Sequence, residues 1–287
     1  MRGRESNGFI AKSSEHDSGN GTETAFYLRE GTGCRGVSGA AIRSARDVQR
    51  PFRLLLARNA ASLVAFVSDA PSLPEEMESF PDRRIQLPFG FRLMSNPTAR
   101  LQIQTDDRDR MVQVQDTRFI YNWIKKRDVY PRYYTIRKEF EGAFGDFGKF
   151  VERSQLAKLR VNQWEVTYVN HVHSGELWKT HSELPRLFPG LMKPIEPYGG
   201  TVFETFAGEW HSEIPQGRGR LYVNAQLMGI VQPDGPPLEA FVLRLTARGP
   251  ANNDFTWDEG FELGHNAIVR TFDEVTSETA KHAWGKE

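Results

Sequence analysis

Apolar and polar residues alternate along several segments of the chain, which is the pattern of half-buried β-strands. In the first such segment, Leu101 and Ile103 alternate with polar neighbours, the polar stretch 105–109 follows, and Val112 and Val114 resume the alternation. A short polar stretch between two alternating segments is typical of a hairpin connection. We therefore predict a β-hairpin over residues 101–114.

The parity of the apolar positions changes directly after this hairpin. Val112 and Val114 occupy even positions, whereas Phe119, Tyr121 and Trp123 occupy odd positions. Successive residues of a strand point to opposite faces of a sheet, so one continuous strand could not bury both sets without an irregularity. We expect a bulge or kink near residues 116–117 that turns the second set toward the core.

Further strands follow in the second half of the chain. The alternation over residues 164–172 is the clearest, and turn-forming sequences with proline and glycine separate three more alternating segments. Between the first and second of these four strands, a helix is predicted over residues 177–188, because Pro189 and Gly190 would end it. The three later strands are predicted over residues 202–211, 221–229 and 238–247.

Two segments carry apolar residues at steps of three and four, which is the pattern of an amphipathic helix. The first follows Pro131 and contains Gly142, Gly145 and Gly148, each of which costs about 1 kcal/mol relative to alanine, so this helix must depend on packing. The second begins near residue 257, and a final short helix capped by Thr276 or Ser277 follows it. Their apolar positions are Tyr133, Ile136, Phe140, Ala143, Phe147 and Phe150, and Phe261, His265, Ile268, Phe272 and Val275.

The order of these elements predicts an α+β fold of antiparallel sheets, each packed by a long helix. Residues 1–46 are polar and glycine-rich without apolar periodicity, and we expect them to be a disordered extension. Residues 47–160 form the first predicted α+β unit and residues 161–287 the second. Both units end in antiparallel strands and an aromatic-faced helix. This likeness suggests a degenerate duplication of β-α-β-sheet-α units, analogous in fold only to the halves of the TATA-binding-protein fold.

Composition and charge narrow the classes of function. The 287 residues are 39% hydrophobic and 26% charged, which excludes a wholly disordered, collagenous or coiled-coil chain. Lys and Arg number 37, and so do Asp and Glu. This balance disfavours a polyanion-binding protein that depends on bulk positive charge, although a local basic patch stays open.

Cysteine content and the lack of long apolar runs suggest a location. The single cysteine, Cys34, cannot form an intramolecular disulfide, and no Cys/His metal spacing surrounds it. This usage favours a reducing compartment. We find no apolar run of signal-peptide or membrane-span length, so we expect a cytoplasmic protein without a membrane partner.

Several sequence stretches resemble a known family. They are residues 113–123 (QVQDTRFIYNW), 130–133 (YPRY), 165–170 (EVTYVN) and 245–249 (LTARG), with the closing Trp284 and Gly285. On these motifs, residues 72–287 resemble a sporadically distributed prokaryotic family of uncharacterised proteins with no assigned activity. The resemblance implies accessory genes scattered among bacteria and archaea, and it implies no catalytic residue. Members of that family usually open with a β-strand and an amphipathic helix, which residues 1–70 do not show clearly.

Histidines and carboxylates are the first candidates for chemistry. His171 and His173 point to the same side of a strand, but another histidine would have to approach to complete a metal site, and no acidic ligand lies at a diagnostic spacing. We therefore expect no metal, no other cofactor and no catalytic residue. The enzyme alternative is a metal-assisted hydrolase in which Glu165, beside aromatic residues, acts with His171 and His173.

Positive charge gathers between residues 125 and 138, where six basic residues accompany one acid and tyrosines are interleaved. Such a mixture can hold phosphates and stack bases. From residue 254 onward the chain carries 8 acidic and 3 basic residues, so the chain could instead neutralise its own basic patch or pair it with a second copy. The basic residues are Lys125, Lys126, Arg127, Arg132, Arg137 and Lys138.

Aromatic and amide residues at strand ends are the candidate recognition elements, because they present polar groups beside apolar area. They are Asn122, Trp123, Tyr130, Tyr168 and Asn170. We predict a cytoplasmic, non-catalytic binding or regulatory protein whose partner is another protein. The alternatives are the hydrolase and a nucleic-acid-binding protein that uses residues 125–138, and a homo-oligomer also stays open.

Overall fold

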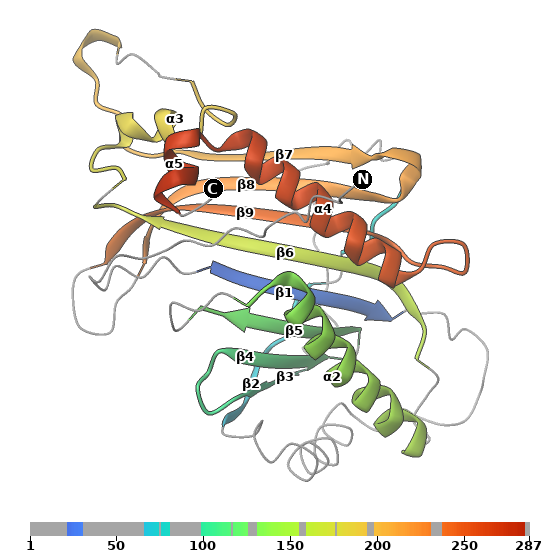
Figure 1. The fold of residues 1–287 in the computed structure, drawn as a ribbon. Coiled ribbons are helices and arrows are strands. Elements are labelled where there is room, and N and C mark those ends of the chain that lie inside the picture. Colours follow the sequence, from blue (N-terminus) through green and yellow to red (C-terminus); the bar gives the residue numbers. More distant parts are fainter. Residues whose placement is uncertain are drawn as a thin grey trace, which may run out of the picture.

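The computed structural model describes residues 22–30, 66–74, 76–80, 99–115, 117–125, 131–154, 159–175, 177–193, 198–230 and 237–284. Its strands form an antiparallel sheet of nine in the order β2-β3-β4-β5-β1-β6-β9-β8-β7 (Figure 1). They are β1 (Thr22–Glu30), β2 (Phe66–Pro71), β3 (Ala99–Gln104), β4 (Arg110–Gln115), β5 (Arg118–Ile124), β6 (Val161–His173), β7 (Ala207–Ile214), β8 (Gly219–Ile230) and β9 (Leu238–Pro250). The helical elements are α2 (Tyr133–Arg153), η1 (His181–Glu183), α3 (Leu184–Leu187), η2 (Tyr198–Gly200), η3 (Pro215–Gly217), α4 (Trp257–Val275) and α5 (Glu278–Ala283).

Two long helices cover one face of this sheet, α2 over the β5 side and α4 over β6 and β9 (Figure 1). Phe140 and Phe147 of α2 pack against Phe119 of β5, with ring centroids 5.9 and 5.2 Å apart. α4 approaches the sheet most closely at Gly260 and Gly264, where a Cβ atom would collide with the Trp164 indole of β6. The predicted α+β class, with a long helix packed on each half, is confirmed.

The two helices also contact each other and share one core. Phe140 packs edge-on against Phe261 of α4, with ring centroids 5.1 Å apart, and Tyr133 stacks on His265 at 3.8 Å. Most of the buried apolar side chains of both halves form one continuous cluster, and Val169, Ala240 and Val242 form a small separate one. The helix-covered face of the sheet is therefore occupied by the hydrophobic core.

β1 lies in the middle of the sheet, although it falls within the segment that we predicted to be disordered. It pairs with β5 on one side and with β6 on the other. The prediction of disorder is therefore wrong for residues 22–30, and the rest of 1–46, including Cys34, lies outside the described residues. A central strand is stabilised by backbone hydrogen bonds to partners on both sides. A short apolar run can therefore form such a strand, although we predicted disorder because the segment lacks a longer apolar periodicity.

β4 and β5 are two antiparallel strands separated by two residues of the chain, where we predicted one strand with a bulge. Their antiparallel pairing places Val112 opposite Tyr121 and Val114 opposite Phe119. Residues directly opposite each other in a pair point to the same face, so the parity change arises because the chain reverses direction. The predicted bulge is wrong, and the hairpin of β3 and β4 is confirmed.

Two predicted elements are shorter than expected or shifted. The helix predicted over 177–188 consists only of η1 and α3, because a capping box formed by Thr180 and Glu183 starts it at residue 181. The strand predicted over 202–211 is β7, and its pairing with β8 runs from Ala207 to the turn at η3. Gly217 has the positive φ, 64°, that this turn requires.

The two halves have a similar order of elements. In the first, β1 pairs with β5, the strand that precedes α2, and in the second, β6 pairs with β9, the strand that precedes α4. Pairing of β1 with β6 joins the two antiparallel sheets edge to edge. This similar order of elements supports the predicted duplication and the predicted division of the chain at residues 160–161. Both remain predictions.

Within the described ranges, we find no helix with the length and apolar character that crossing a bilayer requires.

Candidate functional site

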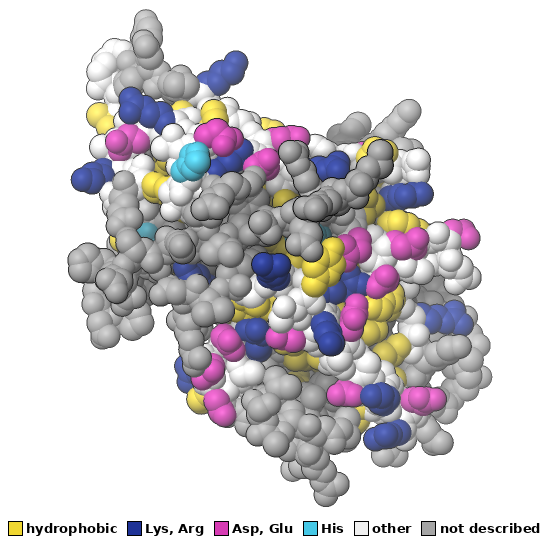
Figure 2. All heavy atoms as spheres, in the orientation of Figure 1, with side chains coloured by type: hydrophobic (Ala, Val, Ile, Leu, Met, Phe, Trp, Pro, Cys, Tyr) yellow, Lys and Arg dark blue, Asp and Glu magenta, His cyan; other side chains and the backbone are white. Residues whose placement is uncertain are grey.

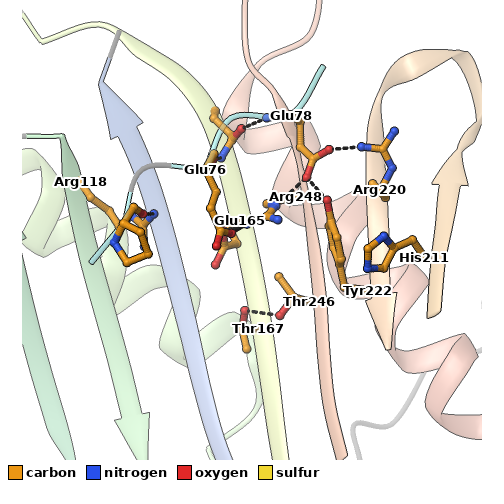
Figure 3. Close-up of polar contacts among 12 residues, drawn as sticks. Glu76, Glu78, Arg118, Glu165, Thr167, His211, Arg220, Tyr222, Thr246 and Arg248 are labelled. Carbon is orange, nitrogen blue, oxygen red and sulfur yellow. Dashed lines mark hydrogen bonds and ion pairs between the residues drawn. The ribbon is translucent and has the colours of Figure 1, made fainter. Parts of the chain in front are cut away.

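The face of the sheet opposite α2 and α4 carries polar side chains from neighbouring strands, and we call it the strap face. Trp164 points to α4, so its neighbour Glu165 points to the strap face, and pairing extends this assignment to adjacent strands. The strap face carries Arg118 of β5, Gln163, Glu165 and Thr167 of β6, Arg220 and Tyr222 of β8, and Arg244, Thr246 and Arg248 of β9. Figure 3 shows most of these side chains together.

An extended segment, described over residues 72–74 and 76–80, crosses the strap face, and we call it the strap (Figure 3). Gln115 holds the first part: its Oε1 accepts from the Leu73 amide at 3.0 Å, and its Nε2 donates to the Leu73 carbonyl at 3.2 Å. Arg118 donates to the Pro74 carbonyl at 3.1 Å. These side chains satisfy strap backbone groups as a neighbouring β-strand would.

Gln163 on β6 holds the strap backbone in the same way. Its Nε2 donates to the Glu76 carbonyl at 3.1 Å, and its Oε1 accepts from the Glu78 amide at 2.8 Å. The Gln163 side chain lies at the base of the site, since the residue is only 1% exposed. Two glutamines of the sheet thus bind both donors and acceptors of the strap backbone.

Glu78 inserts its carboxylate between strands β8 and β9. Its side chain is 2% exposed. It accepts hydrogen bonds from Arg220 and Tyr222, and from Arg248 Nε at 2.6 Å (Figure 3). Arg248 also donates to Glu76, whose side chain is about half exposed, and lies 3.6 Å from Glu165. Charge-assisted hydrogen bonds of this kind are the strongest in proteins, so Glu78 is the anchor of the strap.

The positions of two arginines in the sheet explain why a carboxylate is bound here. Arg220 and Arg248 are direct cross-strand neighbours, and like charges placed opposite each other destabilise a sheet. Burial alone would lower the pKa of Arg248, but Glu165, Tyr222, Glu78 and Glu76 together raise it above its ordinary value. Burial, followed by the hydrogen bond to Glu78, raises the pKa of Tyr222. The buried Glu78 carboxylate thus pairs with both of these neighbouring arginines.

Beyond the strap, the strap face carries polar side chains beside a small buried apolar cluster of Val169, Ala240 and Val242. Thr167 and Thr246 share a hydrogen bond of 2.9 Å, and Arg244 is exposed. Glu209 accepts from His211 and, at 3.2 Å, from Asn224, and these bonds lower the pKa of Glu209. Arg244 is thus accessible on β9, whereas Val242 and Ala240, which follow it on the same face, are buried.

The predicted recognition residues divide between the two faces. Asn122 is on the strap face, 1% exposed, and its Oδ1 accepts from Gln113 at 2.6 Å. Trp123 and Tyr168 are on the helix-covered face, where Trp123 is buried and Tyr168 hydrogen-bonds with His265 at 2.8 Å. Asn170 is half-buried and makes a long contact of 3.5 Å with the Leu243 carbonyl. Tyr130 lies outside the described residues.

The predicted basic patch is also divided. Arg137 is buried between the helices and pairs with Asp258 and Glu262 of α4, so this charge is neutralised within the chain. Arg132 and Lys138 are exposed and Lys125 is half-buried, whereas Lys126 and Arg127 lie outside the described residues. On the face drawn in Figure 2, the described Lys and Arg side chains are interspersed with Asp and Glu.

The residues of the hydrolase alternative do not come together. Glu165 and His171 are six residues apart on β6, which is about 20 Å along a strand. The rings of His171 and His173 lie 6.3 Å apart, and burial, His173 and Arg244 lower the pKa of His171. Among the described residues, no cluster of three or more His, Cys, Asp or Glu side chains could hold a metal ion.

Sequence reasoning found Glu165 but missed the arginines and the strap. Arg220 and Tyr222 alternate with Leu221 and Val223, and Arg248 alternates with apolar residues in β9. Long polar side chains at alternating positions of two adjacent strands were the available signal, because they imply a second face that needs counter-charges. The pairing that joins them to Glu78 spans 142 residues of sequence for Arg220 and could not be inferred locally.

Comparisons with known proteins give no match to a family model, to a curated protein or to a solved structure. The resemblance to the prokaryotic family therefore stays a prediction.

Proposed function

We propose that this protein is a cytoplasmic, non-catalytic binding or regulatory protein whose protein partner binds the strap face. The observation that carries the proposal is the strap itself, an extended peptide held on a sheet by glutamine and arginine side chains. A surface that binds backbone amides and carboxylates has the chemistry required to recognise an extended segment of another protein. Accessory genes of the prokaryotic family that the sequence resembles would suit a regulatory role.

Arg244 and the polar residues around it extend this surface away from the strap. Arg244 is exposed on β9, and Gln226 of β8 is half-buried on the same face. The helix-covered face is less suitable, because the core fills the space between it and the helices. A partner is therefore expected to contact residues of β8 and β9 on the strap face.

Site-specific photo-crosslinking in cells that produce the protein tests this proposal. A photoreactive residue at Gln226 should yield a discrete adduct, whereas the same residue at the exposed Glu152 of α2 should not. The Arg244→Glu variant should weaken the adduct at position 226 without changing the melting temperature, because surface substitutions alter stability little. Equal adducts from both positions, or none from position 226, would contradict a partner site on the strap face.

A further inference from the structure

β2 and the strap are attached to the molecule without contributing to its hydrophobic core. Among their described residues, none belongs to the buried core, and β2 has only β3 as a neighbour in the sheet. Phe66 and Val67 of β2 are 43% and 37% exposed. Segments with few buried apolar contacts open at a lower free energy than the core does. The strap can therefore leave the sheet while the core stays folded.

The contacts that hold the strap are those of a peptide in a binding site. Gln115 and Gln163 recognise backbone groups, which any extended chain provides. Specificity comes from Arg220, Tyr222 and Arg248, which surround one carboxylate, and a second carboxylate two residues earlier in the strap contacts Arg248. An occupant of this site must be extended and must carry acidic side chains two positions apart.

We propose that the strap is an internal ligand, and that the protein partner binds the same site with an extended acidic segment that displaces it. This inference rests on the proposed function and adds both the chemistry of the partner and its regulation. The partner can bind only those molecules in which the strap has left the site. The apparent affinity is therefore the affinity of the open site multiplied by the fraction of molecules that are open. When the partner segment displaces the strap, it replaces the polar contacts of the strap by polar contacts of its own. The hydrophobic core therefore stays covered both with the strap bound and with the partner bound.

Charge complementarity favours this occupant over an apolar one. With the strap removed, Arg220 would lose its ion pair with Glu78, and Arg248 would lose its ion pairs with Glu76 and Glu78. Removing the partner of a buried charge is strongly destabilising, so an open site favours a ligand that restores the carboxylates. A neutral or basic segment could not do so.

Fluorescence anisotropy with a labelled peptide of residues 72–80 tests the inference on the full chain. The Glu76→Gln/Glu78→Gln variant weakens the internal ligand, and we expect it to bind the peptide at least tenfold more tightly than the wild type does. A peptide with glutamine in place of both glutamates should bind at least tenfold more weakly to that variant. The Glu209→Gln variant, which alters a carboxylate of the same face outside the strap site, should behave as the wild type.

Hydrogen exchange on the wild type keeps the test decisive if the double variant does not fold. Excess peptide should accelerate exchange of the Leu73 and Glu78 amides, because it competes with the strap for Gln115 and Gln163. Unchanged exchange together with no peptide binding overturns the inference. A wild-type dimer that exchanges its straps would overturn it too, because the occupant would then be a second copy. If either of these results were obtained while the photo-crosslinked adduct at position 226 persisted, the proposed function would still be supported.

Discussion

His265 is a titratable residue buried inside the helix-covered core. Its ring stacks on Tyr133 at 3.8 Å, and the hydroxyl of Tyr168 lies 2.8 Å from its Nδ1 atom. Burial lowers the pKa of His265 to about 4 from its ordinary value of 6.5. The folded protein therefore keeps this ring neutral at pH 7 and resists its protonation in mild acid.

This shift predicts a loss of stability in mild acid. Above pH 6.5 the ring is neutral in both states, whereas between pH 6.5 and about 4 only the unfolded chain takes up the proton, so unfolding becomes more favourable as the pH falls. The full effect is about 3 kcal/mol. Urea melts of the wild type and of His265→Gln at several pH values measure it. The difference in free energy of unfolding between the two proteins should change with pH between about 6.5 and 4. A difference that is constant over this range would contradict the lowered pKa of His265.

At the level of elements, α2 and α4 contain glycines in opposite environments. A Cβ atom at Gly260 of α4 would lie 2.3 Å from the Trp164 ring, whereas nothing lies within 4 Å of a Cβ atom at Gly145 of α2. Gly260 therefore allows the close approach of helix and sheet. Gly145 only lowers the helix propensity.

Alanine substitutions at these two glycines should consequently have opposite effects on the stability of the protein. Gly260→Ala should destabilise the protein by about 1 to 3 kcal/mol, because the buried indole has to move. Gly145→Ala should stabilise it by about 0.5 to 1 kcal/mol. Thermal melts of the two variants beside the wild type measure both effects. Stabilisation by Gly260→Ala would show that α4 is not packed on Trp164.

Aromatic residues on the same helices provide a test of the shared core. Phe140 is fully buried between α2, α4 and the sheet, and Phe272 of α4 is 7% exposed. Phe140→Ala and Phe272→Ala should each cost about 3 to 5 kcal/mol in urea melts, since each removes buried apolar area and leaves a cavity. Tyr134→Ala is the matched control, because Tyr134 is 65% exposed on the same helix as Phe140. Neutral effects at both phenylalanines would mean that the helices do not pack by these faces.

For the molecule as a whole, the sequence predicted what depends on neighbouring residues and missed what depends on distant ones. Periodicity located α2, α4 and β6, because their buried positions repeat within each element. Acidic residues of α4 neutralise Arg137, as the charge counts suggested. In contrast, β1 is stabilised by strands about 90 to 150 residues away, and Glu78 by arginines 142 and 170 residues away. Such contacts leave no local pattern.

The position of β1 predicts that removing it will disrupt the whole molecule. β1 is the strand that joins the two halves of the sheet, so its loss would leave β5 and β6 with unpaired edges in the middle of the protein. A chain without residues 1–46 should melt more than about 5 °C below the wild type, or fail to fold. A chain without residues 1–20 retains β1 and separates its effect from that of the preceding residues. If removal of 1–46 left the melting temperature unchanged, β1 could not be a central strand, and the two sheets would have to be stable without it.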